Sequence, residues 1–70
     1  MMPYINVKIT DENVTRPQKD ALIAGITELI SVVLQKKPEY TTIVIEEIPT
    51  DNWGIGGQNY QDFILNPNAK

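Results

Sequence analysis

The sequence predicts a small α+β domain in which a strand, a long helix and a second strand form a βαβ unit, with a hairpin after it. Three observations carry this prediction. Apolar and polar residues alternate over Tyr4–Thr10, apolar residues recur at helical spacing over Leu22–Leu34, and β-branched residues are dense over Thr41–Ile48. At 70 residues, the chain fits a single domain spanning 1–70.

The first predicted strand has one face suited to a core. Ile5, Val7 and Ile9 point one way along Tyr4–Thr10, and polar residues point the other way. Residues 11–14, which are polar except for Val14, then form a turn.

The helix is expected to begin near Thr15. Thr15 and Gln18 have the spacing of a capping box, and Pro17 suits a first helical turn, where its missing N–H costs nothing. Arg16 is the alternative cap, because a residue before proline is biased away from helical geometry.

A broad apolar stripe predicts that one face of this helix is buried. It contains Leu22, Ile26, Leu29 and Val33, and Ile23, Ile30 and Leu34 widen it. Gly25 inside the helix suggests close packing against another backbone. Lys36 and Lys37 are expected in the last turn, with Pro38 marking the end.

The second strand, Thr41–Ile48, is apolar on both faces and is therefore predicted to be an interior strand, parallel to the first. Glu46 and Glu47 are adjacent and should point to opposite faces, so they cannot form a paired-carboxylate site within one chain. Trp53–Gly57 alternates apolar residues with glycines and suits a hairpin or a bulged strand. Residues 60–65 are expected to form a short closing segment, and 66–70 a loose tail.

Composition excludes several functions. With 6 basic and 9 acidic side chains the net charge is -3, which argues against a nucleic-acid partner. No apolar run is long enough to span a bilayer and no signal-peptide pattern is present, so no membrane partner and a cytoplasmic location are expected. The chain contains no Cys and no His, which excludes disulfides, common zinc sites, thiolate nucleophiles and imidazole bases.

The energetics of so small a chain predict self-association. Burial of apolar surface should contribute roughly 105 kcal/mol at about 25 cal/mol per Å². Ordering the chain costs roughly the same amount at about 1.5 kcal/mol per residue. Because disulfides and zinc are excluded, partner copies remain as the source of further stability. Two copies that pair their βαβ units edge to edge would form a four-stranded sheet with two helices on one face.

In the order and spacing of its segments, the sequence resembles the 4-oxalocrotonate tautomerase family of the tautomerase superfamily. Met2-Pro3-Tyr4-Ile5 resembles the family's start, where methionine is removed to expose an N-terminal proline. Gln18–Ile23 resembles its helix opening, Ile43–Glu47 its second strand, and Trp53–Gly57 its terminal hairpin. The similarity covers Pro3 to about Gln58.

The resemblance implies a fold, an assembly and a site. Subunits would form dimers and commonly a hexamer, a trimer of dimers. The catalytic group would be the free amine of Pro3, acting as a general base without metal or cofactor, on a small-molecule substrate such as the enol of a 2-oxo acid. Trp53 and Ile55 would be substrate-pocket walls, and Arg16, near a helix N-terminus, would be the anion contact.

Three departures from the family pattern bear on these implications. Two arginines that bind substrate carboxylates in the family align with Val14 and Thr42, so a monocarboxylate or a neutral enol is at least as plausible a substrate as a dicarboxylate. Met1 and Met2 both precede Pro3, and an amide nitrogen would have no usable basicity. The segment after Gln58 could cover the pocket or add to an interface.

Two alternatives to a tautomerase remain. One is a relative that hydrates, dehalogenates or decarboxylates a small acid, with protonated Pro3 as the acid. The other is a noncatalytic oligomer that keeps the fold.

Overall fold

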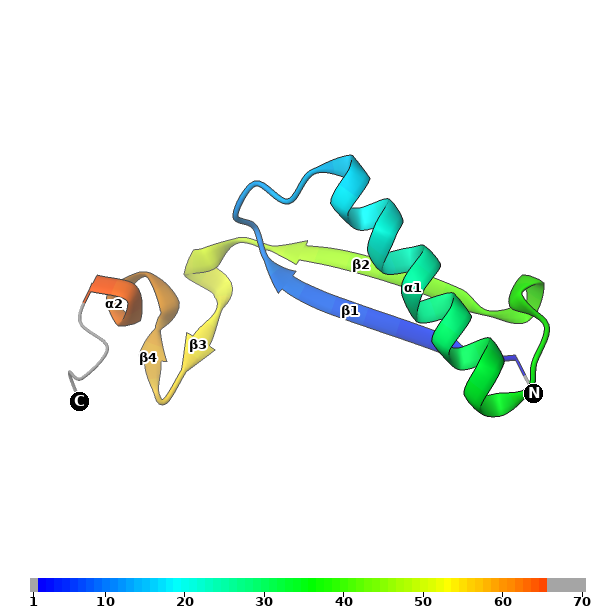
Figure 1. Ribbon diagram of the computed structural model, residues 1–70. Helices are drawn as coiled ribbons and strands as arrows, with labels where there is room; N and C mark the ends of the chain where they lie inside the picture. The colour runs from blue at the N-terminus through cyan, green and yellow to red at the C-terminus, as the bar shows by residue number, and fades with distance from the viewer. Residues whose placement is uncertain (1, 66–70) are drawn as a thin grey trace.

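The computed structural model describes residues 2–65 and contains the predicted βαβ unit and hairpin (Figure 1). β1 (Tyr4–Thr10) and β2 (Thr42–Ile48) form a parallel two-stranded sheet, and α1 (Arg16–Leu34) crosses one face of it. The strand predicted over Tyr4–Thr10 is confirmed. Within the described chain β2 pairs only with β1, so the interior position predicted for it would need a second copy.

The predicted capping box begins α1. The Thr15 hydroxyl accepts a hydrogen bond from the Gln18 N–H at 3.3 Å, and the Thr15 N–H donates to Gln18 Oε1 at 2.9 Å. Two otherwise unpaired N–H groups are thereby satisfied. Arg16 is the first helical residue, so Thr15 is the cap.

The helix ends earlier than predicted. Gln35 adopts the left-handed conformation, with φ of 54°, and its N–H donates to the Ser31 carbonyl. The Ser31 hydroxyl donates to the Lys36 carbonyl at 2.7 Å. Lys36 and Lys37 therefore follow the helix and are not in its last turn, because a left-handed residue stops the helical hydrogen bonding. The short helix η1 (Pro38–Tyr40) leads to β2.

The two faces of the sheet differ in chemistry. Glu46 lies on the outer face, where its Oε1 accepts a hydrogen bond from Asn6 Nδ2 at 2.8 Å and lies 3.7 Å from Lys8 Nζ. Glu47 points to the helix and forms an ion pair with Lys19 of α1. The predicted opposite orientation of the two glutamates is confirmed. The half-buried apolar residues between helix and sheet include Ile5, Val7, Ile26, Ile30, Ile43 and Ile45.

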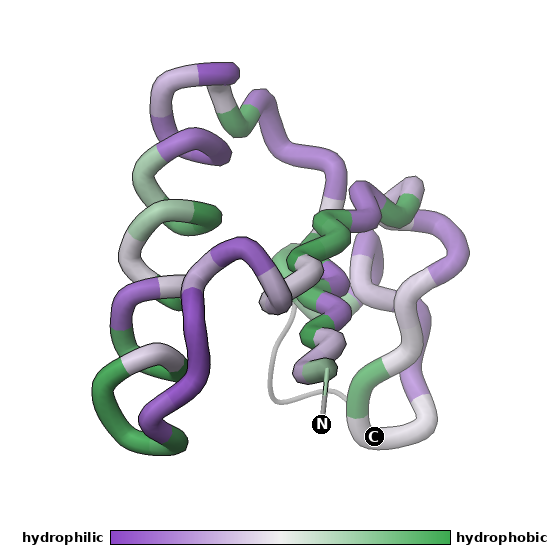
Figure 2. The backbone as a smooth tube through the Cα atoms, turned by 90° about the vertical axis from the view of Figure 1, so that its right-hand side faces the viewer, coloured by the Kyte–Doolittle hydropathy of each residue, from purple (hydrophilic) through white to green (hydrophobic). Residues whose placement is uncertain are grey.

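The predicted burial of the α1 stripe is wrong for a single chain. Ile26 and Ile30 are half-buried, but Leu29 is 60% exposed and Val33 66%. Two strands about 4.8 Å apart are too narrow to cover an apolar stripe on a helix about 10 Å wide. A Cβ atom built on Gly25 would meet no atom within 4 Å, so the close backbone approach expected there is also absent from the described chain. Figure 2 shows the last turns of α1 as largely hydrophobic and its first turn as hydrophilic.

The C-terminal unit lies beyond the carboxyl ends of β1 and β2 (Figure 1). It consists of η2 (Thr50–Asn52), β3 (Gly54–Ile55), β4 (Gln58–Asn59) and α2 (Tyr60–Leu65). The hairpin predicted at Trp53–Gly57 is confirmed. Its turn places Gly56 and Gly57 at φ of 61° and 80°, and two positive φ angles are typical of the tight turns that join antiparallel strands. The closing segment is a helix, and the tail predicted over 66–70 lies outside the described residues.

The chain is elongated. It measures 46 × 23 × 16 Å and has a radius of gyration of 15.8 Å, against about 11 Å for a compact domain of this length. None of the side chains in residues 2–65 is fully buried. No helix in this part of the chain combines the length and apolarity needed to cross a membrane.

Candidate active site

Pro3 lies directly before β1 and is half-buried. Its carbonyl accepts a hydrogen bond from the Thr42 N–H at 3.0 Å, which continues the parallel ladder by one residue and fixes the proline at the start of the sheet. Met2 precedes it in the described chain, so the ring nitrogen is there part of a peptide bond.

Arg16 lies at the first position of α1, beyond the carboxyl end of β1. Its Nε donates to Asp20 Oδ1 at 2.9 Å, one helical turn further on, and its side chain is 85% exposed. Such exposed pairs contribute little to stability. The other N–H groups of the Arg16 guanidinium could still donate to an anion, but the nearby Asp20 carboxylate already offsets the positive charge of the guanidinium.

Trp53 and Ile55 lie in the C-terminal unit. Trp53 ends η2, where its N–H donates to the Thr50 carbonyl at 3.2 Å, and its own carbonyl accepts from the Tyr60 N–H at 2.7 Å. The side chain of Trp53 is half-buried and that of Ile55 is 38% exposed. Backbone hydrogen bonds on both sides therefore hold the indole residue next to the hairpin.

One chain does not bring the four predicted site residues together. Pro3 precedes the two strands, whereas Arg16, Trp53 and Ile55 all follow their carboxyl ends (Figure 1). The seven residues of β1 alone span about 23 Å at roughly 3.3 Å per residue. A substrate that touches both Pro3 and Trp53 therefore needs two copies of the chain.

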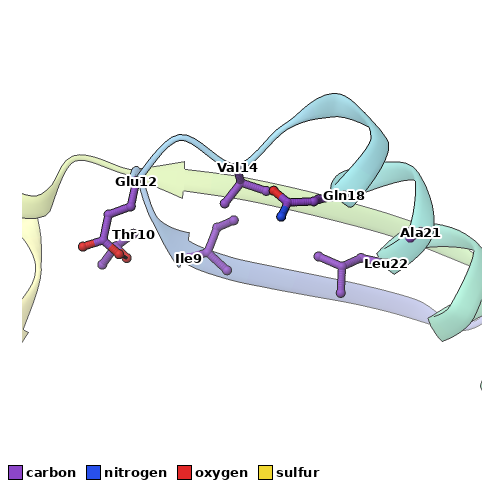
Figure 3. Close-up of a pocket in the computed structure, with 7 residues that line it drawn as sticks. All are labelled: Ile9, Thr10, Glu12, Val14, Gln18, Ala21 and Leu22. Atoms are coloured by element: carbon purple, nitrogen blue, oxygen red, sulfur yellow. Dashed lines mark hydrogen bonds between the residues drawn. The ribbon is translucent and has the colours of Figure 1, made fainter.

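An open depression of about 600 Å³ lies between β1 and α1, and it contains none of these four residues. Figure 3 shows Leu22 and Ala21 of α1 at one end of it, and Thr10 and Glu12 at the other. Val14, where the resemblance places one family arginine, is also in its lining, together with Ile9 and Gln18. The depression is mainly the uncovered gap between helix and sheet. Thr42, where the resemblance places the other family arginine, lies beside Pro3 and is exposed.

Sequence reasoning did not anticipate that Glu12 influences Tyr60. A side-chain hydrogen bond with Glu12, followed by burial and by the negative charge of Glu12, raises the pKa of the Tyr60 hydroxyl above its usual value. The Thr10 hydroxyl donates to the same carboxylate at 2.9 Å. Nothing local in the sequence pairs residues 48 positions apart.

The described residues 2–65 hold no cluster of three or more His, Cys, Asp or Glu side chains suited to a metal ion.

Comparison with known proteins gives consistent results. The protein family described as Tautomerase enzyme matches residues 3–62. The chain is 50% identical over 58 residues to Probable tautomerase K2 of Dickeya dadantii, which covers 83% of this chain and 87% of the relative.

Solved structures agree. DmpI from Helicobacter pylori superposes with a TM-score of 0.85 at 34% identity, covering 90% of this chain and 97% of that one. The apo form of an unfused 4-oxalocrotonate tautomerase superposes with a TM-score of 0.79 at 36% identity, covering 87% of this chain and 98% of that one. The predicted tautomerase-like α+β fold is thereby confirmed.

Proposed function

Since the chain belongs to the 4-oxalocrotonate tautomerase family, we propose that it interconverts the keto and enol forms of a small 2-oxo acid or related enol, with the amine of Pro3 as general base. The observation that carries the proposal is the position of Pro3. It is the first residue of the family match and is held at the start of β1 by the Thr42 N–H.

The amine of an N-terminal proline suits this chemistry. Its lone pair takes a proton from the carbon beside the carbonyl, the C–H electrons form the enol double bond, and the ammonium returns a proton elsewhere on the conjugated system. Covering the site with apolar residues disfavours the ammonium, which lowers the pKa of the amine toward neutrality. The reaction then requires neither a metal nor a cofactor.

The proposed site is shared between copies of the chain. Pro3 comes from one copy, and Trp53, Ile55 and Arg16 come from another, because one chain keeps them at opposite ends. The exposed apolar residues of α1, with Val32 at 69% and Val33 at 66%, support an oligomer in which partners cover them. We propose the family's hexamer, a trimer of dimers, as the assembly.

The proposed substrate carries at most one carboxylate. The resemblance places two substrate-binding arginines where Val14 and Thr42 stand, and both replacements are uncharged. The remaining candidate, Arg16, already shares its charge with Asp20. One partly offset cation fits a monocarboxylate or a neutral enol better than a dicarboxylate.

The test compares two defined N-termini. Chain that begins at Pro3 and chain that retains Met2 are verified by intact mass and assayed with phenylpyruvate enol. We expect activity from the first form and loss of about 10²-fold or more in the second and in Pro3→Ala, since general-base catalysis contributes that much. Pro17→Ala on α1 is the matched control and should retain activity. Equal turnover by material that retains Met2 would refute Pro3 as base, and turnover of 3-haloacrylates alone would indicate hydration or dehalogenation.

A further inference from the structure

The depression between β1 and α1 has an apolar side and a polar end. Ile9 of β1 and Val14 of the following loop are half-buried, and Leu22 of α1 continues the apolar side. Figure 3 shows Glu12 and Thr10 together at the end opposite Leu22. The volume of about 600 Å³ suits a small molecule, since ligand pockets commonly measure about 300–1,000 Å³.

A short loop holds Glu12 and Val14 at this depression. The Asp11 N–H donates to the Ile48 carbonyl at 2.8 Å, so the loop begins on the sheet, and it ends at the capping box of α1. Asn13 adopts the left-handed conformation, with φ of 67°, which asparagine tolerates better than most residues. Because the loop is fixed at both ends, Glu12 projects from a held piece of backbone.

The Glu12 carboxylate has no cation paired with it. The Thr10 hydroxyl donates to its Oε2 at 2.9 Å, which orients the carboxylate at the end of β1. The remaining lysines of the described chain, Lys36 and Lys37, follow the other end of α1. The basic side chains within residues 2–34 form ion pairs with other carboxylates: Lys8 with Glu46, Arg16 with Asp20 and Lys19 with Glu47. The polar end of the depression therefore carries a negative charge that no ion pair within residues 2–65 offsets.

Gln18 adds a neutral donor to the lining. Its Oε1 accepts from the Thr15 N–H at 2.9 Å in the capping box, which leaves its amide nitrogen as the donor. Figure 3 shows this nitrogen pointing toward the space between Ile9 and Leu22. The depression thus combines apolar walls, a neutral amide donor and an anionic acceptor.

We infer that this depression receives the part of the substrate farthest from Pro3, and that Glu12 selects a neutral distal group, above all one with a hydroxyl, and rejects a second carboxylate. The inference rests on the proposed function and deepens it by naming the substrate class. A hydroxyl donates to the carboxylate, whereas a second carboxylate would meet a like charge and lose its water without gaining a cation. The copy that brings Pro3 closes the depression, which is open in a single chain.

Four enols that share one reacting end test this selectivity: phenylpyruvate and its para-hydroxy, para-carbamoyl and para-carboxylate ring derivatives. The carbamoyl group is the control for the carboxylate, because it has nearly the same shape and no charge. In the assembled chain that begins at Pro3, we expect kcat/KM for the para-carboxylate to be at least about tenfold below that for the para-carbamoyl enol. The para-hydroxy enol should exceed the unsubstituted one by about threefold to tenfold. Equal values for carboxylate and carbamoyl would overturn the inference.

Substitution of Glu12 separates its charge from its shape. Glu12→Gln keeps the bulk and an acceptor oxygen, so the carboxylate and carbamoyl enols should then differ by less than about threefold in kcat/KM. Asp11→Asn is the matched control, because it removes the neighbouring charge from a residue that does not line the depression, and it should leave the parent ratio unchanged. A Glu12→Gln protein with the parent ratio would refute the role of Glu12.

Methyl NMR locates the ligand without turnover. The probe is para-carbamoylphenylpropanoate, which keeps the ring and one carboxylate but has no carbonyl to enolise. In the assembled protein it should shift the methyl signals of Ile9, Val14 and Leu22, and not those of Val44, which pairs with Asn6 on the outer face of the sheet. Shifts that leave out all three lining residues would overturn the assignment of the depression.

The two proposals fail in different ways. If the chain with free Pro3 turned over none of the four enols, the proposed function would be overturned, and the methyl shifts would still decide whether the depression binds the probe. If it turned over all four with similar kcat/KM, the selectivity would be overturned and the proposed function would stand.

Discussion

Subunit complementation tests the shared site directly. Pro3→Ala and Trp53→Ala each damage one half of the proposed site, and these halves lie at opposite ends of a chain 46 Å long. When the two variants are mixed as unfolded chains and refolded together, some sites will combine the intact Pro3 of one copy with the intact Trp53 of another. Neither variant alone can form such a site.

The size of the recovery follows from random assortment. In a 1:1 mixture each site has about a one-half chance of an intact Pro3 and an independent one-half chance of an intact Trp53, so about one quarter of the sites are intact in a symmetric assembly. The assay is turnover of phenylpyruvate enol at a fixed total concentration of chain, with parent protein refolded in the same way as the reference. We expect about one quarter of the parent rate above the two variant baselines.

The contradicting result is equally clear. If Pro3 and Trp53 of the same chain formed the site, every site in the mixture would carry one defect. The turnover rate of the mixture would then equal the mean of the rates of the two variants measured alone. Recovery absent from a mixture proven by native mass spectrometry to contain both chains would therefore refute the shared site.

Three further predictions concern stability and titration. The Thr41 hydroxyl is shielded from solvent without a hydrogen-bond partner among the described residues, so Thr41→Val should stabilise the protein by about 1 kcal/mol. The control Thr42→Val, at an exposed position, should change stability by less than about 0.5 kcal/mol. A lower free energy of unfolding for Thr41→Val, measured by chemical denaturation, would contradict this prediction. Gly25→Ala should stabilise the protein by about 0.5–1 kcal/mol, because the position is helical and no atom lies within 4 Å of the added methyl group. If the variant were instead less stable than the parent at the same chain concentration, a partner backbone would cover this position. The pKa of Tyr60 is raised by its hydrogen bond to Glu12, so this bond contributes stability that is fully present below the unfolded pKa of about 10 and is lost as pH rises through the higher folded value. An ultraviolet titration should show a late-ionising tyrosine, and Tyr60→Phe should abolish this late phase. If the phase persisted in Tyr60→Phe, Tyr60 would be excluded as its source.

Local patterns predicted most of the fold. The alternation over Tyr4–Thr10 and the spacing of Thr15 and Gln18 are short-range signals, and the structure reproduces both. The helix end was less predictable, because glutamine has no strong preference for the left-handed conformation that Gln35 adopts. The charges of Lys36 and Lys37, with Pro38 after them, predicted that both lysines belong to the last turn, although the helix ends at Leu34.

The site was less accessible to sequence reasoning. The ion pair of Lys19 with Glu47 joins residues far apart in the chain, and only the folded backbone brings them together. The roles assigned to Pro3 and Trp53 came from the family resemblance, and they stay predictions. Periodicity along one chain cannot indicate that two such residues belong to different copies.

The lack of a fully buried side chain in residues 2–65 has a consequence for how the protein becomes active. Without an interior of its own, a newly synthesised copy gains most of its structural stability on meeting others, so maturation should be a bimolecular or higher-order process whose rate rises with expression level. Diluting purified protein below the dissociation constant of the assembly should then abolish turnover and ordered structure together. The total activity in a cell would therefore rise more than in proportion to the concentration of the chain.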